Sequence, residues 1–185
     1  MAKITELLPT NIFDHIEIGA GIILNNFDTE SWTPSASAII GATSGGINFT
    51  DTPTYTDFGE DIDNCPKNTK ELKMLDSREI KLSGTYVSLN PNEIKSLIAS
   101  ADIDEGSKVI TPRSTISEED FSDIWFVGDY GVDNCVAIHL ENALSTGGFS
   151  LQTADKSKGQ FAFEYTAHYS SNDSTKVPYT VYFKK

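Results

Sequence analysis

Residues 79–101 read EIKLSGTYVSLNPNEIKSLIASA, and this stretch contains the two patterns that decide the fold. In its first half, from Glu79 to Leu89, apolar and polar side chains alternate. A period of two places one set of side chains on a buried face of a strand and the other set in solvent. We therefore predict a long, half-buried strand here. Its buried face consists of Ile80, Leu82, Gly84 and Tyr86.

The pattern changes to that of a helix at Asn90. Asparagine is a good N-cap, proline suits the first helical position, and Glu93 stands where the acid of a capping box belongs. Apolar residues then recur at the i, i+3, i+4 spacing of one helical face. We predict a short α-helix over about residues 91–100. Its apolar stripe is Ile94, Leu97 and Ile98, continued by Ala101.

The residues before this stretch predict a strand and a long loop. An apolar run at 38–40 leads into the glycines of Gly41–Gly46, and an extended pattern resumes at 47–50. The following segment is rich in Asp, Asn and Pro, residues that are depleted in strands and common in turns. We therefore expect a long polar loop over about residues 51–69.

The rest of the chain is dominated by further strand patterns. A first strand over 15–24 is bent or bulged at Gly19–Gly21, and the loop at 25–37 holds Trp32, which we expect to pack on the core. We predict a turn at 128–131. Shorter strands are expected at 108–111, 124–127 and 135–141, a single helical turn at 117–120, and a C-terminal hairpin of 160–169 with 179–183. Eight or nine strands with one helix predict a mainly β fold, a sandwich or a partly open barrel.

Length and charge set further bounds. A chain of 185 residues fits one domain over 1–185, with residues 1–14 as an extended arm or a short turn. The net charge of −13 argues against a basic surface for nucleic acid. Cys65 and Cys135 form no C-x-x-C pair; free thiols are the first expectation, and one disulfide stays open. Neither a signal-peptide pattern nor a long apolar run is present, so we expect synthesis in the cytoplasm and no membrane insertion.

The sequence contains only weak matches to motifs for catalysis or ligand binding. Gly41–Gly46 has P-loop-like glycines but lacks the lysine, so a bulged strand edge is the better interpretation. The acids Asp57, Glu60, Asp61 and Asp63 do not follow the order of a calcium loop, and as a carboxylate pair they are better read as solvated. His15, His139 and His168 have no second ligand at useful spacing.

The aromatic face of Phe161, Phe163, Tyr165 and Tyr169 is typical of a core rather than of a stacking platform. Two glycosylation sequons, at 48–50 and 172–174, carry no meaning without a secretory signal. We expect no catalytic residue, no metal site, no cofactor and no enzyme activity.

The order of these segments is similar to that of a known family. The run Ala42–Phe49, a long acidic loop, a strand, a capped helix and a hairpin at the C-terminus resemble the major tail (tail tube) proteins of long-tailed bacteriophages, of the siphophage type. The resemblance covers roughly Ile12 to Lys185.

The resemblance implies a β-sandwich flanked by a helix, six copies in a ring, and rings stacked into a hollow tail tube through which DNA is ejected. It implies tape-measure, tail-tip and tail-terminator proteins as partners, and a place in the virion after assembly in the host cytoplasm. Under it, the loop at 51–68 and the N-terminal arm are candidates for contacts between rings. We also expect lumen-facing acids to keep DNA from adhering, because basic contacts would hold the phosphates.

Three other functions stay open. One is the tube of a contractile tail or of a related secretion apparatus. Another is a monomeric β-sandwich module that binds carbohydrate or a receptor through Trp32. The third is an enzyme that uses an acidic pair on the same fold.

Overall fold

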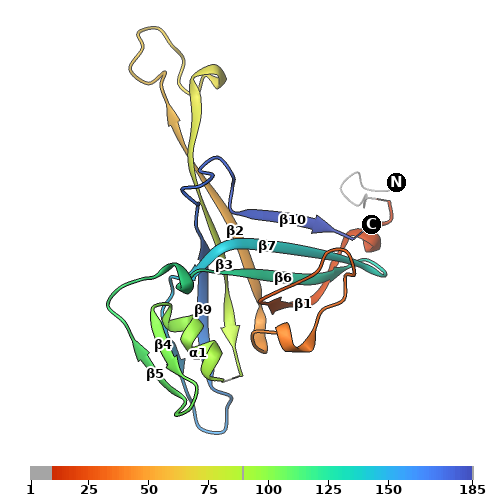
Figure 1. The fold of residues 1–185 in the computed structure, drawn as a ribbon. Coiled ribbons are helices and arrows are strands. Elements are labelled where there is room, and N and C mark those ends of the chain that lie inside the picture. The colour runs from red at the N-terminus through yellow and green to blue at the C-terminus, as the bar shows by residue number, and fades with distance from the viewer. Residues whose placement is uncertain (1–9, 89, 185) are drawn as a thin grey trace.

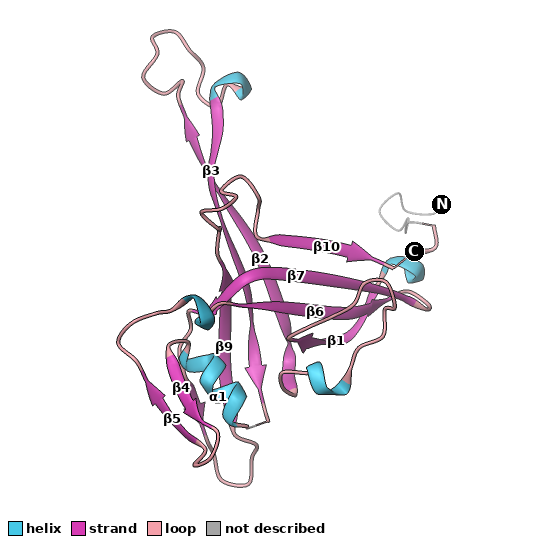
Figure 2. Ribbon diagram, in the orientation of Figure 1, coloured by secondary structure: helices cyan, strands magenta, loops and turns pink. Residues whose placement is uncertain are grey.

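The structure is a computed structural model that describes residues 10–88 and 90–184. Within these residues the chain is mainly β, with antiparallel pairing and one α-helix (Figures 1 and 2). The strands are β1 (Glu17–Leu24), β2 (Thr43–Asp57), β3 (Lys73–Tyr86), β4 (Ala101–Asp104), β5 (Val109–Pro112), β6 (Ser122–Tyr130), β7 (Asn134–Ser145), β8 (Ser150–Gln152), β9 (Gln160–Ala167) and β10 (Tyr179–Phe183). The α-helix is α1 (Pro91–Ile98), and short 3-10 helices cover Ile12–His15, Ala36–Ala38, Lys70–Leu72 and Glu118–Asp120.

Eight strands form one sheet that folds over onto itself. Six of them follow the order β1-β6-β7-β9-β3-β2, while β10 pairs with β7 and β8 pairs with β9. The group β2, β3 and β9 runs across the group β1, β6, β7 and β10 (Figure 2). The two ends of the sheet meet where the backbone N–H of Ile40 donates to the carbonyl of Ile23 at 3.0 Å. This arrangement is consistent with a β-sandwich.

The main core lies between the two strand groups and under α1. The face predicted for the long strand is confirmed, since Ile80, Leu82 and Tyr86 are fully buried. The predicted aromatic face of β9 is also core, although Tyr169 lies beyond the strand and is exposed. The other members of this cluster are Ile23, Leu97, Ile124, Phe126, Leu140, Ala143, Phe161, Phe163, Tyr165 and Ala167.

Strand β6 is buried on both faces, because the loop before β2 covers its outer side. Trp125 and Val127 point away from the main core and join a second cluster with Phe27 of that loop. Trp32 packs edge-on against Phe27, with ring centroids 5.7 Å apart. The prediction that Trp32 fastens the loop to the core is confirmed.

Helix α1 has the predicted capping box. The backbone N–H of Glu93 donates to the side chain of Asn90, and the carboxylate of Glu93 accepts from the backbone N–H of Asn90. The helix ends at Ile98 rather than at residue 100, because Ala99 has a positive φ of 68°. The bulge predicted in the first strand is also present, as a register shift between Ile18 and Ile22.

The predicted loop over residues 51–69 is wrong in its first part. Strand β2 continues to Asp57, and β3 begins at Lys73, so only residues 58–72 connect them. Thr52, Thr54 and Thr56 favour the extended backbone because they are β-branched. Pro53 is tolerated because β2 is an edge strand in this segment, with β3 as its partner.

The predicted C-terminal hairpin is wrong as well. Strand β10 pairs with the first half of β7, from Val136 to Leu140, whereas β9 pairs with its last residues, Ala143–Ser145. The alternation in β9 and β10 is real, but the two strands do not pair with each other, because both pair with β7. The turn predicted at 128–131 is also misplaced, because β6 runs on to Tyr130.

Residues 1–9 lie outside the described residues, as does most of the predicted N-terminal arm; Ile12–His15 form a 3-10 turn. None of the helices in residues 10–88 and 90–184 is both long and apolar enough to cross a membrane.

Candidate interaction surface

The most prominent feature of the molecule is a two-stranded arm that projects from the body (Figure 1). We define the arm as residues 51–79: the outer part of β2, the connection 58–72 and the outer part of β3. Strand β9 pairs with β3 only from Lys81 onwards. In the described part of the chain, the arm therefore has no third strand, and both of its faces are open.

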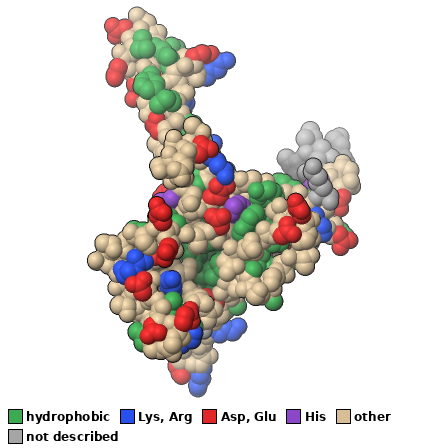
Figure 3. Space-filling model, viewed as in Figure 1, with side chains coloured by type: hydrophobic (Ala, Val, Ile, Leu, Met, Phe, Trp, Pro, Cys, Tyr) green, Lys and Arg blue, Asp and Glu red, His purple; other side chains and the backbone are tan. Residues whose placement is uncertain are grey.

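The arm exposes large apolar side chains. Tyr55 lies opposite Leu75 in the β2–β3 register, and Met74 is next to Leu75. Figure 3 shows hydrophobic side chains gathered along the arm. Exposed apolar groups that gather in one place mark interaction sites more often than single ones do. The apolar set of the arm is Tyr55, Phe58, Ile62, Met74 and Leu75, with exposed fractions between 43% and 57%.

The end of the arm is organised by Asp57. Its carboxylate accepts from the backbone N–H of Gly59 at 2.9 Å and from that of Asn68 at 2.7 Å. These two hydrogen bonds hold the pKa of Asp57 below its ordinary value. The backbone N–H of Phe58 also donates to the carbonyl of Leu72 at 3.0 Å, which closes the connection. Phe58 and Ile62 of the apolar set are thus presented on a defined loop, while the other three lie on β2 and β3.

The acids considered as a cation site do not form one. Asp57 is engaged by backbone N–H groups, and Glu60, Asp61 and Asp63 are exposed along the connection. Among the described residues, no three His, Cys, Asp or Glu side chains gather as metal ligands would.

The three histidines are not brought together either. His139 stacks on Trp125 with ring centroids 3.9 Å apart, and its Nε2 lies 3.1 Å from a carboxylate oxygen of Asp123. His168 packs edge-on against Phe121, while His15 is in the first 3-10 turn. Each histidine has local neighbours of its own.

The glycine segment and the cysteines match their simplest interpretations. Gly45 and Gly46 have φ values of 83° and 86°, in a register shift between Thr43 and Ile47, which confirms a bulged strand edge. Cys65 on the arm and Cys135 on β7 are free thiols. Burial, together with a hydrogen bond to Asp129, raises the pKa of Cys135, so its thiol is not activated.

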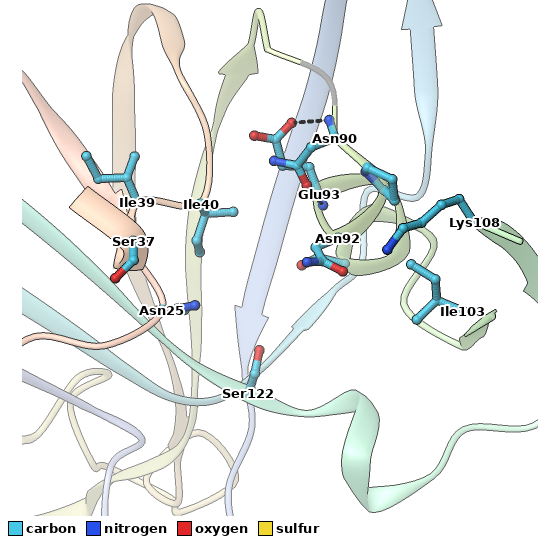
Figure 4. Close-up of a pocket in the computed structure, with 12 residues that line it drawn as sticks. Asn25, Ser37, Ile39, Ile40, Asn90, Asn92, Glu93, Ile103, Lys108 and Ser122 are labelled. Carbon is cyan, nitrogen blue, oxygen red and sulfur yellow. Dashed lines mark hydrogen bonds between the residues drawn. The ribbon is translucent and has the colours of Figure 1, made fainter. Parts of the chain in front are cut away.

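A cavity of about 460 Å³, lined by both polar and apolar residues, lies beside the N-terminus of α1 (Figure 4). Glu93 lines it and is 4% exposed. Both carboxylate oxygens of Glu93 are engaged, one by the hydroxyl of Ser88 at 2.8 Å and the other by the backbone N–H of Asn90 at 3.0 Å. These contacts give the buried charge a structural role in capping the helix.

No family model matches the chain, and no curated protein matches it. The family resemblance named residues 51–68 as a candidate contact, but sequence reasoning missed the apolar surface because it treated residues 51–69 as a polar loop. A signal was present, since six large apolar residues, Leu72 and the five of the exposed set, recur between 55 and 75 in an otherwise polar segment.

Proposed function

We propose that this chain is the structural subunit of a phage tail tube of the siphophage type. In this proposal six copies form a ring, rings stack into a hollow tube, and DNA passes through the lumen. The observation that carries the proposal is the arm, which presents five large apolar side chains outside a mainly β body. Such a surface gains free energy when a partner removes it from water, at roughly 25 cal/mol per Å² of apolar area.

The open edge of the sheet at β10 also supports self-association. Strand β10 pairs with β7 on one side, and its outward residues Val181 and Phe183 are exposed. An edge strand of this kind is a template for pairing with another chain, and closure into a ring is one way to use it. In the proposal, edges join copies within a ring, and the arm reaches a copy in the next ring.

The charge is compatible with passage of DNA. Six copies at −13 each carry −78 per ring, a sign that repels phosphates. The partners in this proposal are further copies of the chain and the tape-measure, tail-tip and tail-terminator proteins. The place of the protein is the virion tail, after assembly in the host cytoplasm.

The test is negative-stain electron microscopy across protein concentration, with light scattering for mass. We expect hollow rings or tubes with six-fold symmetry. The double variant Phe58→Ser, Ile62→Ser is expected to form rings that do not stack into tubes, with an unchanged unfolding midpoint of the monomer, because both side chains are exposed. The matched control is Val109→Ser, which removes a side chain that is 54% exposed on β5, outside the arm.

Two outcomes would contradict the proposal. One is a chain that stays monomeric even with tail-tip and tape-measure proteins present. The other is stacking of the double variant into tubes at the same concentration as the unaltered chain.

A further inference from the structure

Three side chains from three strands converge where the arm leaves the body. Arg78 on β3 pairs with Asp51 on β2, through one carboxylate oxygen, Oδ2. The hydroxyl of Tyr179, at the start of β10, donates to the same oxygen at 2.9 Å. The side chains of Asp51 and Arg78 are 15% and 29% exposed, so this contact is largely shielded from water.

The second oxygen of Asp51 is unusual. Oδ1 is buried and has no hydrogen-bond partner among the described residues, although both donors converge on Oδ2. A buried acceptor without a partner reduces stability, so such a group needs an explanation other than stability. The three side chains come from three different strands, so their contacts join these strands at the base of the arm.

The ring of Tyr179 is itself held in place. Its centroid lies 5.3 Å from that of Phe49, which is on the same strand as Asp51. The hydrogen bond to Asp51, together with burial, raises the pKa of Tyr179, so the hydroxyl stays protonated and remains a donor. Tyr179 therefore connects the base of the arm to β10.

We propose that Asp51, Arg78 and Tyr179 form a clamp that fixes the direction of the arm and couples it to the position of β10. A two-stranded ribbon on its own is marginally stable and free to bend. Residues 51–79 form such a ribbon, because β9 pairs with β3 only from Lys81 onwards, so contacts at the base of the arm decide where it points. Since β10 is an edge strand, a partner strand that pairs with β10 would act on the arm through Tyr179. The clamp belongs to the fold of the single chain and does not depend on the proposed function.

The two native cysteines permit a direct test. Cys65 lies on the arm and Cys135 on the body, so spin labels on both report the direction of the arm as a distance distribution. Labelled chains are diluted with unlabelled chains so that only distances within one molecule contribute. Tyr179→Phe removes a single hydroxyl. The matched control is Tyr182→Phe on the same strand, whose hydroxyl has no hydrogen-bond partner in the described residues.

We expect Tyr179→Phe and Asp51→Asn to broaden the distance distribution, and Tyr182→Phe to leave it unchanged. We also expect backbone amides of residues 52–57 and 73–79 to exchange with deuterium about ten-fold faster in Tyr179→Phe, the scale of one lost hydrogen bond to a charged group. Amides of β9 and of β3 beyond Ile80 keep their rates.

Either of two results overturns the clamp. An unchanged distance distribution together with unchanged exchange in the arm shows that the three side chains do not hold it. A rise in exchange across β9 and the body, equal to that in the arm, shows that Tyr179 contributes to general stability and not to the direction of the arm.

Discussion

Two variants of Glu93 can separate the contribution of its hydrogen bonds to stability from the contribution of its charge. Its buried carboxylate accepts from the hydroxyl of Ser88 and from the backbone N–H of Asn90. Glu93→Ala removes both acceptors. At about 1.5 kcal/mol for each hydrogen bond to a charged group, the expected loss in free energy of unfolding is about 3 kcal/mol.

Glu93→Gln retains the size of the side chain and both contacts. The amide oxygen can accept from the N–H of Asn90, and the amide nitrogen can donate to the hydroxyl oxygen of Ser88. The expected loss is therefore about 1 kcal/mol or less, the difference between a hydrogen bond to a charged and to a neutral group.

Urea unfolding followed by tryptophan fluorescence measures both variants, because Trp125 is buried beside the core. The protein is kept at a concentration where light scattering shows a monomer. With a denaturant slope of about 2 kcal/mol per M, Glu93→Ala should lower the midpoint by about 1.5 M and Glu93→Gln by about 0.5 M or less. Equal losses for the two variants would refute the reasoning, since charge would then be the cause. A loss under about 0.5 kcal/mol for Glu93→Ala would show that the two donors find water instead.

Two further perturbations test local geometry and charge. Gly21 has a φ of 64°, and a Cβ there would meet the ring of Phe126 and lie 2.8 Å from the carbonyl oxygen of Val127, whereas Gly45, at a φ of 83°, has open space. Gly45→Ala should cost about 1 kcal/mol of unfolding free energy from backbone strain, and Gly21→Ala about 3 kcal/mol because overpacking is added; equal midpoints in urea would contradict this. Asp120 has a side chain that is 2% exposed; burial opposes its ionisation, but the backbone N–H of Ser117 and the charge of Arg113 outweigh it and lower its pKa. When the pKa of a carboxyl group is lower in the folded state, its ionised form stabilises the protein at pH values above the ordinary carboxyl pKa. This contribution is lost as the pH falls through the lowered pKa. Asp120→Asn should therefore destabilise the protein more at pH 7 than at a pH below the ordinary carboxyl range; an equal loss at both pH values would exclude the ionised carboxylate as the cause.

Local patterns in the sequence were sufficient to predict the capped helix, the buried face of β3 and the bulge in β1. Each of these depends on residues within a few positions, such as Asn90 and Glu93 in the capping box. The pairing of β10 could not be predicted in this way. Its partner, Val136–Leu140, is about 40 residues distant, and alternation alone does not distinguish β7 from β9 as a neighbour.

The arm could not be predicted for a related reason. Aspartate and proline in residues 51–57 favour turns in isolation, yet pairing with β3 compensates for their low strand propensity. The clamp at the base of the arm joins positions 128 residues apart, Asp51 and Tyr179, and each of them looks ordinary in its own segment.

The order of strands in the sheet has a consequence for synthesis of the chain. The arm is complete at residue 79, but β9 and β10, which close the sheet around the body, end at residues 167 and 183. At 5–20 residues per second the interval between residue 79 and residue 183 is roughly 5–20 s. During that time the apolar side chains of the arm have left the ribosome while the body cannot yet fold. Nascent chains on neighbouring ribosomes could meet through their arms in this interval, before β9 and β10 have completed the body.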